Sequence, residues 1–248
     1  MTGRVASLWR HPIKSHGREE VACVTLAAGQ TMPWDRTWAV AHAQSAASNA
    51  AWMQCSAFSR IAKAPKLMAI SCTLDEGSER LTLSHPDRPD LTFHPDTEGD
   101  TFLSWVAPLM PPDRAASARI VRVPGRGMTD SDYPSVTLCN TASHRAVEQR
   151  IGRALSIHRW RGNIWLDGLA PWQEFEWAGQ RLRIGAATLE VREPTTRCMA
   201  TTANPDTGRR DADTLGALDT WGHRDFGVHA VVVEGGKIAP GDGMEILP

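Results

Sequence analysis

One cysteine of this 248-residue chain stands in a setting that suits metal or thiol chemistry. Cys198 directly follows Arg197, and Thr195 and Thr196 place two hydroxyl groups just before it. A neighbouring guanidinium favours the thiolate, the form of cysteine that attacks electrophiles and binds soft metals. The alternative is an inert, buried thiol that packs as a small apolar side chain, which is the usual fate of an isolated cysteine. The residues alone leave both interpretations open.

Basic side chains form a second set with chemical potential. Cations with hydroxyl and amide groups nearby suit a phosphorylated ligand. The chain has no Walker-type loop and no GxGxxG pattern, so a nucleotide is not specifically indicated. The alternative is solvated surface charge, as for most arginines. The set consists of Lys14 with Ser15, Arg36, Arg159, Arg161 with Asn163, Arg192 and Arg197.

Several other kinds of site find no support in the sequence. The five cysteines are scattered, and none is spaced as CxxC, which argues against a structural zinc site or an iron–sulfur cluster. GxSxG and HExxH are absent. A nucleophile–base pair of Cys198 with His229 stays open, and His11 and His16 are poorly spaced for a metal. Catalysis of the serine-hydrolase or zinc-protease type is therefore not expected.

The overall composition predicts a cytoplasmic protein. With 27 basic and 28 acidic residues, the formal net charge is −1, so nothing demands nucleic acid or a membrane surface as partner. No apolar run approaches the roughly 18 residues of a spanning helix. The first residues lead directly into a strand pattern, which leaves no room for a secretory signal.

The elements that must position these groups are mostly short strands separated by Gly, Pro and Asp. Two helices are expected, Thr101–Ala107 after Asp100 and a second from about Ala142 to Leu155, capped by Asn140 or Thr141. Pro108–Gly127 is interpreted as the connection between two halves. The expected strands are Arg4–Arg10, Glu20–Leu26, Thr37–His42, Lys66–Leu74, Arg80–Ser84, Leu91–His94, Arg119–Val123, Asn163–Leu166, Arg181–Ile184, Thr188–Arg192 and His229–Val233.

Taken together and in order, the motifs resemble those of the MOSC (molybdenum cofactor sulfurase C-terminal) family. The MOSC-like segments include Arg161-Gly-Asn163, Thr196-Arg197-Cys198, 204–208 (Asn-Pro-Asp-Thr-Gly), 226–227 (Phe-Gly) and 241–242 (Gly-Asp). The start of the chain, 11–15 (His-Pro-Ile-Lys-Ser) and 35–38 (Asp-Arg-Thr-Trp), resembles the N-terminal β-barrel domain that accompanies MOSC domains. The branch that looks most similar contains the mitochondrial amidoxime-reducing component and its bacterial relatives.

The resemblance implies a mainly β (α+β) fold with few helices, in which a MOSC β-barrel packs on a smaller N-terminal β-barrel-like domain. The expected domains are 1–125 and 126–248. A molybdenum cofactor (Mo-molybdopterin) would lie between them, with Cys198 as the molybdenum ligand and catalytic residue. The implied cofactor-binding residues are Lys14, Ser15, Arg36, Asn140, Arg161, Asn163, Thr196, Arg197 and His229.

Three positions depart from the family pattern and concern individual cofactor contacts. Thr37 replaces the second Arg of an Asp-Arg-Arg-Trp motif, Cys55 ends a Met-Gln-Cys segment where relatives carry Thr-Gln-Arg, and Cys139 stands where relatives often have a serine-rich turn.

The implied function is reduction of a small N-hydroxylated compound, with electrons from a separate ferredoxin- or flavoprotein-type donor. His229 and Asp206 are the candidates for a proton donor. Two other functions use the same residues: a cofactor carrier without turnover, and a sulfur carrier that holds a persulfide on Cys198.

Overall fold

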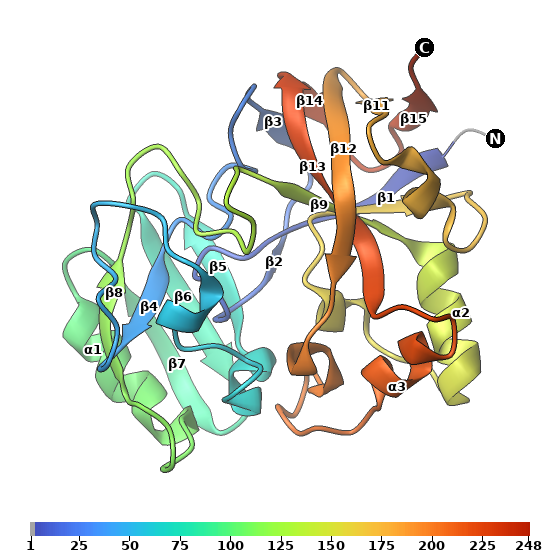
Figure 1. The fold of residues 1–248 in the computed structure, drawn as a ribbon. Helices are drawn as coiled ribbons and strands as arrows, with labels where there is room; N and C mark the ends of the chain where they lie inside the picture. The colour runs from blue at the N-terminus through green and yellow to red at the C-terminus, as the bar shows by residue number, and fades with distance from the viewer. Residues whose placement is uncertain (1–2) are drawn as a thin grey trace.

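The computed structural model describes residues 3–248, which form two lobes lying side by side (Figure 1). These residues contain 15 strands and only three α-helices, so the prediction of a mainly β protein with few helices is confirmed. Among them, no helix is both long and apolar enough to cross a membrane.

The larger lobe is built on a closed barrel. Seven strands follow one another in the order β10-β9-β13-β12-β11-β15-β1, and β1 then pairs with β10 to close the ring. Only the β9–β10 pair is parallel. The barrel strands are β1 (Gly3–Arg10), β9 (Val136–Asn140), β10 (Ile164–Asp167), β11 (Arg181–Ile184), β12 (Ala187–Thr196), β13 (Asp225–Glu234) and β15 (Gly243–Ile246). The far end of β1 carries β2 (Glu19–Glu20), and β14 (Gly236–Ile238) pairs with β3 (Val24–Leu26) nearby.

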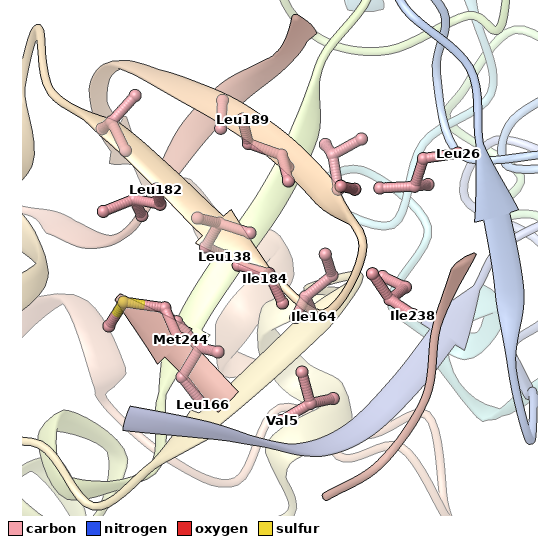
Figure 2. Close-up of a cluster of buried hydrophobic side chains, with 14 of the residues drawn as sticks. Val5, Leu26, Leu138, Ile164, Leu166, Leu182, Ile184, Leu189, Ile238 and Met244 are labelled. Carbon is pink, nitrogen blue, oxygen red and sulfur yellow. The ribbon is translucent and has the colours of Figure 1, made fainter. Parts of the chain in front are cut away.

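Alternating side chains fill the inside of the barrel. In β11, Arg181 and Arg183 are exposed while Leu182 and Ile184 are fully buried, as a strand with one solvated face requires. Figure 2 shows these two side chains with Leu138, Leu166 and other aliphatic residues in one cluster. Each fully buried side chain of this size contributes about 2 kcal/mol from burial. The barrel therefore provides a rigid frame for the strand ends.

The first strand of the chain belongs to the barrel of the second half. Arg4 lies opposite Asp167 and Leu8 opposite Ile164, while Gly3 pairs with Met244. A division of the chain at residue 125 thus separates β1 from every barrel strand that it contacts. The chain enters the smaller lobe only after β1. The first strand of the expected N-terminal domain is therefore part of the barrel of the larger lobe.

The smaller lobe surrounds a core of its own. A two-stranded sheet and a three-stranded sheet face the helix α1 (Gly99–Val106), whose Phe102 stacks on Phe93 at 5.2 Å. Its strands are β4 (Ala39–His42), β5 (Ser71–Asp75), β6 (Arg80–His85), β7 (Arg88–Phe93) and β8 (Ser117–Val121).

The structure corrects one expectation in this lobe. The start of the expected strand Lys66–Leu74 is instead a 3-10 helix, Pro65–Ala69, because Pro65 has no N–H for a sheet and suits the first position of a helix. The expected strand Arg119–Val123 is present as β8, which begins two residues earlier and pairs with β4. It lies within the segment Pro108–Gly127, which was interpreted as the connection between the two halves.

Three differences concern the larger lobe. Strand β9 was not expected, because all five of its residues are buried and the period-2 alternation of a half-exposed strand is missing. The helix α2 (Thr141–Ile151) ends four residues earlier than expected, where Gly152 adopts a left-handed conformation. The short helix α3 (Thr214–Asp219) was also not expected.

Candidate functional site

A cavity of about 180 Å³ is lined by both lobes and contains most of the residues singled out from the sequence. The smaller lobe contributes Arg60, Ile61 and Ala62, and the larger lobe contributes the end of β12 and the segment after it. Eight of the ten predicted site residues line this cavity: Lys14, Ser15, Arg36, Arg161, Thr196, Arg197, Cys198 and His229.

Three of these residues hold an unusual backbone conformation. Ser15, Arg36 and Arg161 have φ angles of 65°, 54° and 51°, in the left-handed region that non-glycine residues seldom adopt. Backbone hydrogen bonds hold two of them in place, from Arg36 N to His11 O (2.8 Å) and from Arg161 N to His158 O (3.2 Å). Each such conformation costs on the order of 1 kcal/mol and occurs preferentially at ligand-binding sites. Of the six non-glycine residues with positive φ among residues 3–248, three thus line the cavity.

The cavity carries a surplus of positive charge. Six cationic side chains line it, and Asp130 is its single carboxylate lining residue. Three of the cations are held by ion pairs: Lys14 with Asp130 (2.5 Å), Arg36 with Asp35, and Arg159 with Asp211 (2.5 Å). The other three, Arg60, Arg161 and Arg197, have no carboxylate partner among residues 3–248.

Two of the unpaired arginines are anchored by backbone carbonyls. Arg161 Nη1 donates to Gly17 O at 3.1 Å, and burial together with the nearby Arg36 lowers the pKa of Arg161 to about 9. Arg197 donates from Nε to Phe226 O (2.8 Å) and from Nη1 to Trp160 O (2.7 Å), and burial lowers its pKa as well. Both remain cations at neutral pH, so the cavity favours an anionic ligand.

Several buried donors in the wall lack a partner. Arg159 Nε, Arg161 Nη2 and Thr195 Oγ1 are inaccessible to solvent and form no hydrogen bond with residues 3–248. An unsatisfied buried donor costs about 1–3 kcal/mol, and most proteins avoid it. All three atoms belong to residues that line the cavity. Guanidinium and hydroxyl donors are what a phosphate group requires, so the residues present fit a phosphorylated pterin.

Cys198 lies exposed at the point where β12 has ended and a 3-10 helix, Met199–Thr202, begins. Its carbonyl accepts hydrogen bonds from the backbone N–H (3.2 Å) and the hydroxyl (3.1 Å) of Thr201. Arg210 connects this helix to the smaller lobe, since it donates to Thr202 Oγ1 (2.6 Å) and to Ala62 O (2.9 Å). The thiol is thereby held at the junction of the lobes, open to the cavity.

His229 lies on β13 and lines the cavity, with Nδ1 at 3.3 Å from Thr137 Oγ1. Burial, followed by the positive charge of Arg197, lowers its pKa to about 4. The imidazole is therefore neutral at pH 7, where it can both donate and accept a hydrogen bond. Asp206, the other candidate for a proton donor, is exposed, lies 3.8 Å from Arg18 and does not line the cavity.

Two predicted cofactor-binding residues, Asn140 and Asn163, lie outside the cavity lining. Asn140 caps α2 by accepting from Ala142 N (2.9 Å), and its amide donates to Ala170 O and Glu174 Oε2. Asn163 accepts from Thr137 N (3.0 Å) and donates to Trp9 O (3.1 Å), which ties β1 to the neighbouring strands. The amides of both residues are thus engaged by other parts of the larger lobe.

The structure also brings in residues that the sequence did not assign to the site. Arg60, Cys55, Asp130 and Trp160 line the cavity. Trp160 stacks on Phe226 at 3.8 Å, and Arg197 lies 5.8 Å from the centres of both rings, so part of the tryptophan cluster supports the site. The tryptophan content gave a local signal for Trp160, and the departure from the family pattern gave one for Cys55. Arg60 and Asp130 had no such signal in the sequence.

Cys139 explains two glycines of the family motifs. A Cβ at Gly162 would lie 2.4 Å from Cys139 Sγ, and one at Gly227 would lie 3.0 Å from Sγ and 2.5 Å from Leu138 O. The buried thiol thus occupies the space behind the cavity wall, 4.0 Å from Arg197 Nη2. The departure at Cys139 affects packing behind the site, while the departure at Cys55 faces the cavity itself.

Two family models match the chain, one in each half. The family described as the MOSC domain matches residues 128–245, and the MOSC N-terminal beta barrel domain matches residues 2–107.

A molybdenum cofactor sulfurase from Drosophila grimshawi is 29% identical over 125 residues, which cover 47% of this chain but 16% of that protein. Among solved structures, the YUAD protein from Bacillus subtilis is similar over 99% of this chain and 96% of its own, with 10% identity and a TM-score of 0.49. YiiM from Geobacillus stearothermophilus covers 46% of this chain and 54% of its own, with 21% identity and a TM-score of 0.36. With both halves of the chain matched in order, this protein belongs to the MOSC-domain family and carries the MOSC N-terminal domain before its MOSC domain.

Proposed function

We propose that the protein is a molybdenum-cofactor-dependent oxidoreductase that reduces N-hydroxylated compounds, such as hydroxylamines and amidoximes. A separate ferredoxin- or flavoprotein-type protein would supply the electrons. One observation carries the proposal: the exposed Cys198 lines the same cavity as Arg159, Arg161 and Thr195, each of which has a buried donor without a partner among residues 3–248. A soft thiolate for a metal and a set of donors for a phosphate are the two things that this cofactor needs.

Different residues of the chain would hold the metal and the anionic tail of the cofactor. Cys198 would ligate molybdenum. Arg161, Arg197, Lys14, Arg36 and the hydroxyl of Thr195 would hold the anionic tail. The MOSC family is associated with binding of the molybdenum cofactor, and a relative named for that cofactor supports the assignment. When bound, the cofactor supplies two-electron oxygen-atom transfer, chemistry that protein side chains lack.

The overall reaction consumes two electrons and two protons: R–NHOH + 2e⁻ + 2H⁺ → R–NH₂ + H₂O. The N–O bond breaks, the nitrogen is reduced, and the oxygen leaves as water. His229 is neutral at pH 7 because its pKa is about 4, so it can orient a ligand by hydrogen bonding while solvent delivers the protons. The exposed position of Cys198 at the lobe junction leaves the reacting end of the cavity accessible to a small substrate.

The test begins with metal content. Wild type and Cys198→Ala are produced in a host that makes the cofactor, purified without chelators, and measured by elemental mass spectrometry for molybdenum. Close to one molybdenum per wild-type chain and little in the variant are expected, together with benzamidoxime reduction by the wild type with a chemical reductant. Cys139→Ala is the matched control, since that thiol lies behind the wall rather than in the cavity. Wild-type protein without molybdenum or pterin would refute the proposal, and full loading without reduction would favour a carrier.

A persulfide carrier is the second candidate, because the curated relative is named as a sulfurase. This function predicts a cyanide-labile sulfur on Cys198 in wild type that is missing in Cys198→Ala, without bound molybdenum. The chain spans 16% of that relative, so a complete sulfurase activity is not implied.

A further inference from the structure

We propose that Arg60 selects substrates with a negatively charged arm, a carboxylate or a phosphate group, in addition to the reducible N–O group. This inference rests on the proposed function, since it concerns the substrate of the same site. It follows from the place of Arg60 in the lining of two cavities and from its lack of a counter-ion.

Arg60 belongs to the lining of two cavities. It lines the cavity that contains Cys198, and it also lines a second cavity of about 270 Å³ in the smaller lobe. The second lining also includes Phe58, Lys63 and Arg114. A ligand with its reactive end near Cys198 and a charged arm directed toward the smaller lobe would therefore meet Arg60.

The charges of the second cavity favour an anion. Its lining includes three cations, Arg60, Lys63 and Arg114, against one carboxylate, Asp113, which lies 3.5 Å from Arg114. Neither Arg60 nor Lys63 has a carboxylate within ion-pairing distance in the described part of the chain. The two unpaired cations lie three residues apart on the segment between two 3-10 helices.

The guanidinium of Arg60 is also poorly satisfied by its surroundings. Its side-chain hydrogen bond goes to Cys55 Sγ at 3.4 Å, a weak acceptor. A half-buried arginine with free donors matches the oxygens of a carboxylate or phosphate in a two-point contact. The backbone beside it is fixed, because Ala62 O accepts from Arg210 at 2.9 Å.

The cofactor would not require Arg60. The buried donors without partners belong to Arg159, Arg161 and Thr195, and Lys14, Arg36 and Arg197 add three cations, so the phosphate of a pterin would have partners without Arg60. Arg60 approaches from the smaller lobe beside Ile61 and carries an additional charge. Its role is therefore assigned to the substrate.

The experiment compares ligands that differ only in charge. The three ligands are benzamidoxime, 4-carboxybenzamidoxime and benzamidoxime with a phosphate group at the same ring position. Each is titrated into molybdenum-loaded protein without reductant, so that none turns over. Kd is measured by calorimetry. Wild type is expected to bind at least one anionic ligand about tenfold more tightly than the neutral one, the effect of about one charge-assisted contact. The carboxylate and phosphate arms show which oxyanion fits.

Arg60→Gln should remove this preference while keeping the affinity for benzamidoxime and the molybdenum content. Arg209→Gln, which removes the same charge from an exposed site outside both cavities, should keep the preference. Equal affinities in wild type would overturn the inference. Loss of molybdenum from Arg60→Gln would also overturn it, because Arg60 would then belong to the cofactor site.

Adding reductant separates this inference from the proposed function. If the anionic preference is present but no ligand is reduced, the proposed function fails and the anion site stands. If all ligands are reduced with the same KM and the same Kd, the function stands and the role of Arg60 is refuted.

Discussion

Replacing Thr195 with valine should make the cofactor-free protein more stable and its cofactor binding weaker. The Thr195 side chain is 8% exposed, and its hydroxyl has no hydrogen-bond partner within the described residues. Valine keeps the shape of threonine and removes the group that loses its water on folding. Because an unsatisfied buried hydroxyl costs about 1–3 kcal/mol, we expect a gain of about 1 kcal/mol in the free energy of unfolding. For a chain of this length that gain raises Tm by roughly 2–4 °C.

The matched control is Thr201→Val, which removes a hydroxyl from the same cavity wall. Thr201 is also buried, but its hydroxyl is 2.6 Å from Thr214 Oγ1 and 3.1 Å from Cys198 O. This substitution breaks existing hydrogen bonds and leaves Thr214 unpaired, so a loss of about 1–2 kcal/mol is expected. The two variants should therefore shift stability in opposite directions.

Urea unfolding followed by tryptophan fluorescence measures both effects, on protein from a host that cannot make the cofactor. The second measurement is molybdenum content after expression in a host that can, where Thr195→Val should contain less than wild type. If Thr195→Val is destabilised as much as Thr201→Val, the Thr195 hydroxyl has a partner in the empty protein. That result would refute the argument that the Thr195 hydroxyl is unpaired until the cofactor binds.

Three more predictions concern packing, capping and pH. Gly162→Ala should cost about 1–3 kcal/mol of stability, because its Cβ would meet Cys139 Sγ at 2.4 Å, and Cys139→Ala in the same chain should restore part of the loss in urea unfolding. Asn140→Ala should cost about 3 kcal/mol, since it removes the cap of α2 and two further hydrogen bonds, while molybdenum per folded chain stays at the wild-type level; a loss of metal with unchanged stability would contradict this. The pKa of His229 is about 4 when folded and near 6.5 when unfolded, so the unfolded chain binds more protons and stability falls as pH drops from 6.5 to 4. His229→Gln should reduce the stability difference between pH 7 and pH 5 by about 2 kcal/mol, and an unchanged difference in the urea midpoints would show that another group is responsible.

The sequence by itself determined the chemical types at the site and the class of fold. The thiol at Cys198, the guanidinium groups at Arg161 and Arg197 and the amine at Lys14 follow from residue identity. Strand alternation such as that of Arg181–Ile184 follows from the period of two that any strand imposes. Both signals are local. The family motifs add the prediction that the thiol, the guanidinium groups and the amine belong to one ligand site.

The tertiary structure decided which polar groups are free to act. Arg161 and Arg192 look alike in sequence, yet Arg161 faces the cavity while Arg192 is exposed and lies 3.2 Å from Glu190. Asn163 belongs to the same motif as the lining residue Arg161, but its amide is bound by the backbone of β1 and β9, and the amide of Asn140 is bound by Ala142, Ala170 and Glu174. The availability of a polar side chain depends on its hydrogen-bond partners, and these come from distant segments.

Closure of the barrel and placement of the cavity are also tertiary outcomes. Strand β1 pairs with β10, about 160 residues later in the chain. The register of such a distant pair cannot be predicted from the local sequence of either strand. Arg60 reaches the site only because the smaller lobe lies against the end of β12. Local patterns fix periodicity and residue chemistry, whereas burial and charge balance arise from contacts between segments far apart in sequence.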